Sequence, residues 1–160
     1  MRKKLSIALG SDHAGYYIKQ QVIDYLRKQD YILHDFGAYS DDDTDYPDYA
    51  HPVASAVEKG EFDFGIVVCG SGNGVNMVVN KHQGIRSALC WKKEIAYIVR
   101  LHNNANICAL PGRYLKKKEA VEIVDVFLNT EFEGGRHLGR VNKIALKNNP
   151  VKDIQARCDQ

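Results

Sequence analysis

The stretch that decides the fold reads Ile66-Val67-Val68-Cys69-Gly70-Ser71-Gly72-Asn73-Gly74-Val75. An apolar run ends in a cysteine, glycines follow at alternate positions, and apolar residues then resume. This order is typical of a buried strand, a tight loop and the start of a helix. Glycines allow successive backbone N–H groups to turn toward one point, which makes an anion-binding nest in front of a helix N-terminus. The stretch therefore predicts a strand–loop–helix unit with a thiol at the rim of an anion site.

Cys69 is the candidate reactive group of this unit, because backbone amides and a helix N-terminus favour a thiolate. The residues alone leave open whether it acts as a base or as a nucleophile. The glycine spacing differs from the dinucleotide fingerprint, whose third glycine lies one position further on, and no Lys-Ser or Lys-Thr follows as in a P-loop. A glycine-rich turn without any ligand is the alternative.

The composition excludes several classes of protein. The chain has 160 residues, 44% of them hydrophobic and 26% charged, which fits one globular domain with a sizeable core. A net charge of +2, spread along the chain, argues against nucleic acid or a membrane as the main partner. No signal peptide or membrane span is recognisable, so a cytoplasmic protein is expected. The four cysteines lack CxxC spacing, so neither a disulfide framework nor a metal site is expected.

Strand-like and helix-like segments alternate along the whole chain. Strands are predicted at 5–10, 31–36, 64–68, 85–90 and 106–110. Helices are predicted at about 18–29, 49–60, 75–80, 92–101 and 117–129, and a final helix from about 135 carries Val141, Ile144 and Ala145. The acidic segment 38–48 is predicted to be a loop. This alternation predicts a single α/β domain: a Rossmann-like three-layer sandwich with a five-stranded parallel sheet and a C-terminal helix. The domain is expected to span 1–148, and Pro150 is expected to end order within a polar tail, 149–160.

Ligands of such folds bind beyond the carboxyl ends of the strands. Asp12 and His13 follow the first strand, Cys69 the third and Arg113 the fifth, so all should share one rim. Asp12 could equally be a simple helix cap. An imidazole beside it favours a functional role, because histidine titrates near neutral pH.

Two further groups of polar residues occur near the ends of predicted helices. His102 and Asn103 close a helix, where both residue types are common for reasons of helix dipole and capping. Arg136 and Arg140 are four residues apart, so they share one helix face that suits a phosphate or a carboxylate. A solvated basic face is the alternative reading. Together these groups indicate a small phosphorylated ligand that is held by arginines and reacts at a thiol.

The chain resembles type B ribose-5-phosphate isomerase, within the group that includes the galactose-6-phosphate isomerase subunits. The resemblance covers nearly the whole chain, and it rests on these segments: Gly10-Ser11-Asp12-His13-Ala14-Gly15, Thr44-Asp45-Tyr46-Pro47, Cys69-Gly70-Ser71-Gly72-Asn73-Gly74, Asn80-Lys81 with Gly84-Ile85-Arg86, His102-Asn103-Asn104-Ala105-Asn106, and Glu133-Gly134-Gly135-Arg136-His137.

The resemblance implies an aldose–ketose isomerase that works through a cis-enediolate without metal or cofactor, in the non-oxidative pentose phosphate pathway. Cys69 would be the base, Ser71 would assist it, and His102 would open the sugar ring with Asp12 nearby. The substrate-binding residues would be the loop residues Gly70, Gly72, Asn73 and Gly74, with Asp45 and Tyr46 lining the sugar pocket, Asn103 on sugar oxygens, and His13, Arg113, Arg136 and Arg140 around the phosphate.

The resemblance also implies a homodimer, or a tetramer of paired dimers, whose sites are shared across the interface. His102, Asn103 and Arg113 would then come from the neighbouring subunit. Ser71 stands where many family members have threonine, and the hydroxyl is kept. Two alternatives to ribose 5-phosphate isomerisation stay open: an isomerase for allose 6-phosphate or galactose 6-phosphate, and a non-catalytic phosphate-binding module.

Overall fold

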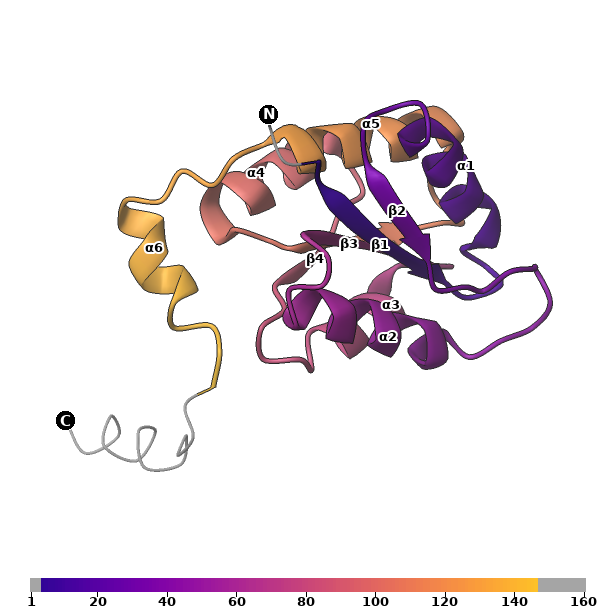
Figure 1. Ribbon diagram of the computed structural model, residues 1–160, viewed down its shortest axis with the longest axis horizontal. Helices are drawn as coiled ribbons and strands as arrows, with labels where there is room; N and C mark the ends of the chain where they lie inside the picture. Colours follow the sequence, from indigo (N-terminus) through magenta and orange to yellow (C-terminus); the bar gives the residue numbers. More distant parts are fainter. Residues whose placement is uncertain (1–3, 147–160) are drawn as a thin grey trace.

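The computed structural model describes residues 4–146, and its centre is a sheet of five parallel strands (Figure 1). The strands lie in the order β2-β1-β3-β5-β4. Their bounds are β1 Ser6–Ser11, β2 Ile32–Asp35, β3 Phe64–Cys69, β4 Ser87–Leu89 and β5 Ile107–Pro111. The predicted fold class, a five-stranded parallel α/β sandwich, is confirmed.

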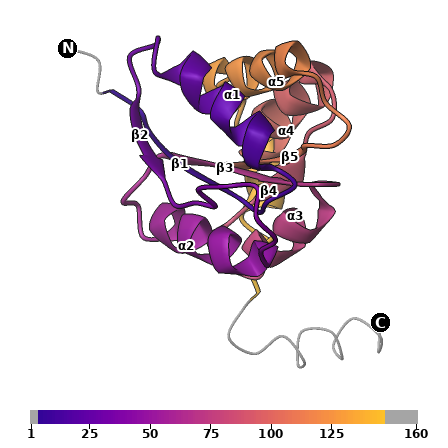
Figure 2. The same ribbon diagram turned by 90° about the vertical axis from the view of Figure 1, so that its right-hand side faces the viewer.

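Helices cover both faces of the sheet, as Figure 2 shows. One face carries α1 Tyr16–Leu26, α4 Lys93–Asn103 and α5 Lys117–Asn129, and the other carries α2 Tyr46–Glu58 and α3 Asn73–Val79. Each face has its own apolar core. Val22 of α1 and Phe127 of α5 belong to the first core, whereas Val53 of α2 and Val79 of α3 belong to the second. None of the helices within residues 4–146 has the length and apolar character needed to cross a membrane.

The central strand β3 is buried almost throughout, because helices cover it on both sides. Its neighbours fix the register: Ile7 of β1 lies opposite Phe64, and Gly65 lies opposite Ile107 of β5. At the far end, Cys69 lies opposite Pro111. The thiol is therefore held at the carboxyl edge of the sheet by pairing on both sides of its strand.

Three predicted helix boundaries are wrong by three residues or more. The first helix ends at Leu26 instead of about Gln29. The second helix begins at Tyr46 instead of about 49, because Pro47 occupies the first turn, where a missing N–H costs nothing. The last helix, α6 Arg136–Val141, ends before Ile144 and Ala145, which were expected to belong to it. Helix α6 stands away from the sheet at the side of α4 (Figure 1). Pro150 and the predicted polar tail, 149–160, lie outside the described residues.

Candidate active site

Cys69 ends β3 with its side chain turned into the loop that follows. The residue is 4% exposed, and its Sγ accepts a hydrogen bond from the N–H of Gly72 at 3.2 Å. Gly72 has φ +73°, a conformation that suits glycine, and a Cβ there would lie 2.9 Å from the backbone carbon of Leu110. The predicted contact between the thiol and a loop amide is thus present. Only glycine fits at position 72 of the loop.

The rest of the glycine loop is open to solvent on one side and covered by an aromatic ring on the other. Ser71 and Asn73 are exposed, and the Ser71 Oγ accepts a hydrogen bond from the N–H of Asn73. Tyr46, at the start of α2, lies against Gly74 so closely that a Cβ on Gly74 would be 2.8 Å from the ring. The neighbouring Asp45 is the N-cap residue of α2. The acidic loop before α2 therefore ends beside the glycine loop.

Asp12 and His13 follow β1 on the same edge of the sheet. Asp12 is 6% exposed, and its Oδ1 accepts a hydrogen bond at 2.9 Å from the N–H of Gly15, the N-cap residue of α1, so it closes the turn before the helix without capping the helix itself. The His13 ring is held by Thr44, whose N–H donates to the unprotonated Nδ1 at 3.2 Å. The Asp43 Oδ1 lies 3.4 Å from the same nitrogen and pairs with it only in the protonated ring. These contacts orient the imidazole at the rim that carries Cys69.

Arg113 lies beside the glycine loop of its own chain. Its N–H donates to the carbonyl of Gly70 at 3.0 Å, and a Cβ on Gly70 would lie 3.4 Å from the Arg113 Cδ. The turn that carries it is tied to β3 as well, since the N–H of Gly112 donates to the Cys69 carbonyl. The expectation that a neighbouring subunit supplies Arg113 is therefore wrong: this arginine contacts the loop of the chain to which it belongs.

A second group of functional candidates gathers at the end of α4. The rings of His102 and His137 stack with their centroids 4.2 Å apart and their planes 9° apart. A pocket of about 280 Å³ adjoins them, and Asn103 and Arg140 are part of its lining. Arg136, also on α6, places its Nε 3.5 Å from the His137 Nε2. Helix α6 thus meets α4 through a cluster of histidines and arginines.

The two groups lie at opposite ends of the parallel strands, which are called here the carboxyl edge and the amino edge of the sheet. His102 and Asn103 come shortly before β5 begins, opposite Gly65, whereas Cys69 and Arg113 lie at the end where β3 and β5 finish. The strand between Gly65 and Cys69 is about 13 Å long at roughly 3.3 Å per residue. One chain therefore does not bring His102, Arg136 or Arg140 to its own Cys69.

Three side chains of the second group have the composition of a metal site. Ligand atoms of His102, Glu133 and His137 lie within 4.8 Å of one another. The guanidinium groups of Arg136 and Arg140 belong to the same helix end, and a positive neighbour opposes a bound cation. Burial lowers the pKa of the His137 imidazole, and the charges of His102 and Arg136 lower it further. The two arginines therefore disfavour a metal ion at this cluster.

Two other cysteines contrast with Cys69. Cys90 and Cys108 are fully buried, as predicted for small core residues. Cys108 lies in β5, whereas Cys90 directly follows β4, which ends at Leu89 and not at the predicted position 90. Burial, followed by the adjacent Cys90 thiol, raises the pKa of Cys108 well above its usual value. Cys108 is therefore protonated and unreactive, whereas Cys69 is the cysteine that reaches a glycine loop.

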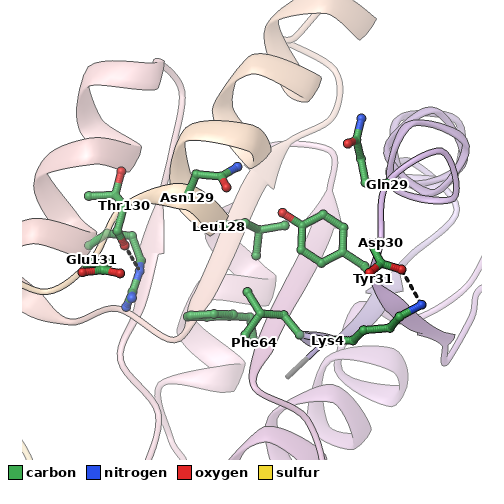
Figure 3. A pocket seen from close by; sticks show the side chains of 11 residues that line it. Lys4, Gln29, Asp30, Tyr31, Phe64, Leu128, Asn129, Thr130 and Glu131 are labelled. Atoms are coloured by element: carbon green, nitrogen blue, oxygen red, sulfur yellow. Dashed lines mark hydrogen bonds and ion pairs between the residues drawn. The ribbon is translucent and has the colours of Figure 1, made fainter. Parts of the chain in front are cut away.

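A larger hollow, of about 640 Å³, lies at the amino edge of the sheet (Figure 3). Tyr31, Phe64 and Leu128 form its apolar wall, and Lys4 pairs with Asp30 at its rim. Among the described residues, its lining contains neither cysteine nor histidine. Size alone thus does not identify the reactive site.

A family model described as Ribose/Galactose Isomerase matches residues 7–144. The chain belongs to this family. Ribose-5-phosphate isomerase B of Escherichia coli is 41% identical over 138 residues, which are 86% of this chain and 93% of the relative. The membership confirms the predicted resemblance and the predicted class of enzyme, a sugar isomerase.

Solved structures of the family share the fold closely. A crystal structure of a ribose 5-phosphate isomerase from Thermotoga maritima has a TM-score of 0.87 and 45% identity, and the match covers 89% of this chain and 99% of that one. The enzyme of Mycoplasma genitalium, solved with bound ribulose-5-phosphate, has a TM-score of 0.83 and 40% identity, with 87% and 93% covered. Both structural matches span most of this chain.

Sequence reasoning missed three residues that support the two groups. Thr44 fixes the His13 ring, and its place in a short polar motif was the only sequence signal for it. Glu133 and His137 contact or adjoin His102 across about 30 positions of chain, which no local spacing could reveal. Their position in the segment that carries the family resemblance was the available clue.

Proposed function

We propose that this protein interconverts ribose 5-phosphate and ribulose 5-phosphate through a cis-enediolate, with Cys69 as the base. The family relatives named above support the reaction. The observation that carries the mechanism is the Cys69 sulfur, which accepts a hydrogen bond from a backbone amide of the glycine loop. A strand end that combines a thiol with loop amides offers both a base and donors for a developing oxyanion.

The chemical step follows from these groups. The Cys69 thiolate takes the proton from C2 of the open-chain aldose, while the electron pair moves to O1 and forms the enediolate. Loop amides of Gly70 to Gly74 donate to this oxygen, and one such donor is worth about 3 kcal/mol in the transition state. The Ser71 hydroxyl passes the O2 proton to O1. Cys69 then returns its proton to C1, which gives the ketose without any net gain or loss of electrons.

The ring-opening and phosphate-binding groups would come from both edges of the sheet. His13 and Arg113 lie at the Cys69 edge, whereas His102, Asn103, Arg136 and Arg140 lie at the other. We propose that two chains meet so that the second edge of one completes the first edge of the other. His102 would then open the furanose ring near Asp12, Asn103 would bind sugar oxygens, and the arginines would hold the phosphate.

Replacement of Cys69 tests the proposal, and Cys90 offers a matched control. Turnover of ribose 5-phosphate should fall by at least about 100-fold in Cys69→Ala, as expected for loss of a general base. Cys90→Ala should keep its turnover within about twofold, because Cys90 is buried in the apolar core on the other face of the sheet from Cys69. Near-normal turnover in Cys69→Ala would refute the mechanism. Phosphate binding without turnover in the wild type would instead favour a non-catalytic module.

The family description also includes galactose, so a six-carbon sugar phosphate is the second candidate substrate. The difference is one carbon of pocket length. We expect kcat/KM for ribose 5-phosphate to exceed that for allose 6-phosphate and galactose 6-phosphate when the three are assayed side by side. The opposite order would assign the protein to the six-carbon branch. With ribose 5-phosphate as substrate, the protein would serve the non-oxidative pentose phosphate pathway in the cytoplasm.

A further inference from the structure

Glu133 lies where one carboxylate oxygen can serve two imidazoles. Its Oε2 is 3.2 Å from the Nε2 of His137 and 3.9 Å from the Nε2 of His102. We infer that Glu133 is a positioning residue, which holds the proton of His102 on Nε2 so that Nδ1 faces the sugar ring. This inference rests on the proposed function, because it assigns Glu133 to the ring-opening step alone.

The fold holds Glu133 in place independently of its side chain. Its backbone N–H donates to the carbonyl of Leu101 at 3.0 Å, which attaches the segment before α6 to the last turn of α4. His137, four residues further on and within α6, is 6% exposed and stacks face to face on His102. The stack fixes the plane of the His102 ring, and the ring itself stays partly exposed. Glu133 therefore approaches an imidazole whose orientation is already set.

The charges around the cluster leave the carboxylate available to His102. Burial, His102 and Arg136 all lower the pKa of His137, so His137 is neutral at neutral pH. The cations that face the two rings are Arg136 and Arg140 on α6, and Glu133 is the acid whose Oε2 lies near the Nε2 of both rings and opposes the lowering of the His137 pKa. A carboxylate only accepts hydrogen bonds, so it selects the His102 tautomer that carries a proton on Nε2. The 3.9 Å separation would shorten on binding, as catalytic hydrogen bonds commonly do.

This tautomer suits the opening of a furanose. The C1–O4 bond breaks, the O1–H electron pair becomes the new carbonyl bond, and one proton must move from O1 to O4. A bare Nδ1 can take that proton from O1 and deliver it to O4, so that His102 ends as it began. Ribulose 5-phosphate does not need this step, because its O5 carries the phosphate and its chain cannot close into a five-membered ring.

Glu133→Ala tests the inference, with Glu131→Ala as the matched control. Both glutamates are exposed and lie two positions apart. We expect kcat/KM for ribose 5-phosphate to fall about tenfold to 100-fold in Glu133→Ala, a part of what acid–base catalysis supplies. Exchange of deuterium from D₂O into C1 of ribulose 5-phosphate should stay within twofold of the wild type. The ¹⁵N shifts of His102 should show the Nε2–H tautomer in the wild type and in Glu131→Ala, and a mixture in Glu133→Ala.

The outcomes separate the inference from the proposed function. Unchanged kcat/KM or an unchanged tautomer in Glu133→Ala would overturn the positioning role. Loss of C1 exchange in the same variant would also overturn it, because Glu133 would then act beyond ring opening. Cys69→Ala provides the separate check: it should lose both exchange and turnover. If it keeps C1 exchange, the proposed enediolate mechanism fails, whatever Glu133 does.

Discussion

The two edges of the sheet differ in how firmly their polar groups are built in. At the carboxyl edge, Cys69 and Asp12 are nearly enclosed, and backbone hydrogen bonds fix the loop around them. At the amino edge, Arg136 and Arg140 are exposed on a short helix that makes few contacts with the body of the domain. The first edge is complete as a place for proton transfer. The amino edge has cations and imidazoles, and a second chain would have to cover it to complete the shared site that we propose.

The largest expected effect comes from replacing one glycine at each edge with alanine. The substitution should lower kcat strongly at the carboxyl edge and hardly at the amino edge. A Cβ at Gly72 would collide with Leu89 and Leu110, and φ is positive there. We expect Gly72→Ala to displace the loop and lower kcat by about 10²–10³, the value of one oxyanion donor. Among residues 4–146, nothing lies within 4 Å of a Cβ at Gly139 in α6, so Gly139→Ala should keep kcat within about twofold.

Steady-state kinetics and a thermal melt on both variants make this comparison. Gly139→Ala should melt at the same or a higher temperature, because alanine favours a helix by about 0.5–1 kcal/mol relative to glycine. A larger loss of kcat in Gly139→Ala than in Gly72→Ala would reverse the contrast drawn here.

Arginines from the two edges should act on the same phosphate. We expect Arg113→Ala and Arg140→Ala each to raise KM for ribose 5-phosphate about tenfold to 100-fold, since a charged hydrogen bond is worth about 1.5–3 kcal/mol. Lys118→Ala removes an exposed cation of α5 and serves as the control. The double variant sharpens the comparison. Its free-energy change should differ from the sum of the two single changes if both groups contact one anion, and strict additivity would argue that they do not.

The smallest expected effect is that acid weakens the docking of α6 at the amino edge and leaves β3 at the carboxyl edge unchanged. Burial lowers the pKa of His137 from its usual value of about 6.5, so the docked ring binds a proton less readily than a free one. As the pH falls below 6.5, His137 of an undocked α6 binds a proton before His137 of a docked α6 does. Protonation therefore favours the undocked state, and docking weakens. Amide hydrogen exchange in α6, corrected for intrinsic rates, should accelerate between pH 6.5 and 5, whereas amides of β3 should not. Equal behaviour of α6 and β3 would contradict this view of the second edge.

The sequence was a good guide to the carboxyl edge and a poor guide to the amino edge. Cys69, Asp12 and Arg113 follow strands of a parallel sheet, so topology alone places them on one rim, where the structure has them. The grouping of His102 with Glu133 and His137 depends on how α6 packs against α4, which periodicity does not encode. The length of α6 was overestimated for a related reason. Apolar residues at helical spacing continue to Ile144, but the helix ends at Val141.

The central claim, that one site combines Cys69 of one chain with His102 of another, is tested most directly by mixing two inactive variants. In a heterodimer of Cys69→Ala and His102→Ala chains, one shared site carries both defects and the other carries none. The account predicts that purified heterodimers recover about half of the wild-type turnover of ribose 5-phosphate per dimer, while each homodimer stays inactive. Confirmed heterodimers with no recovery would show that each site lies within a single chain.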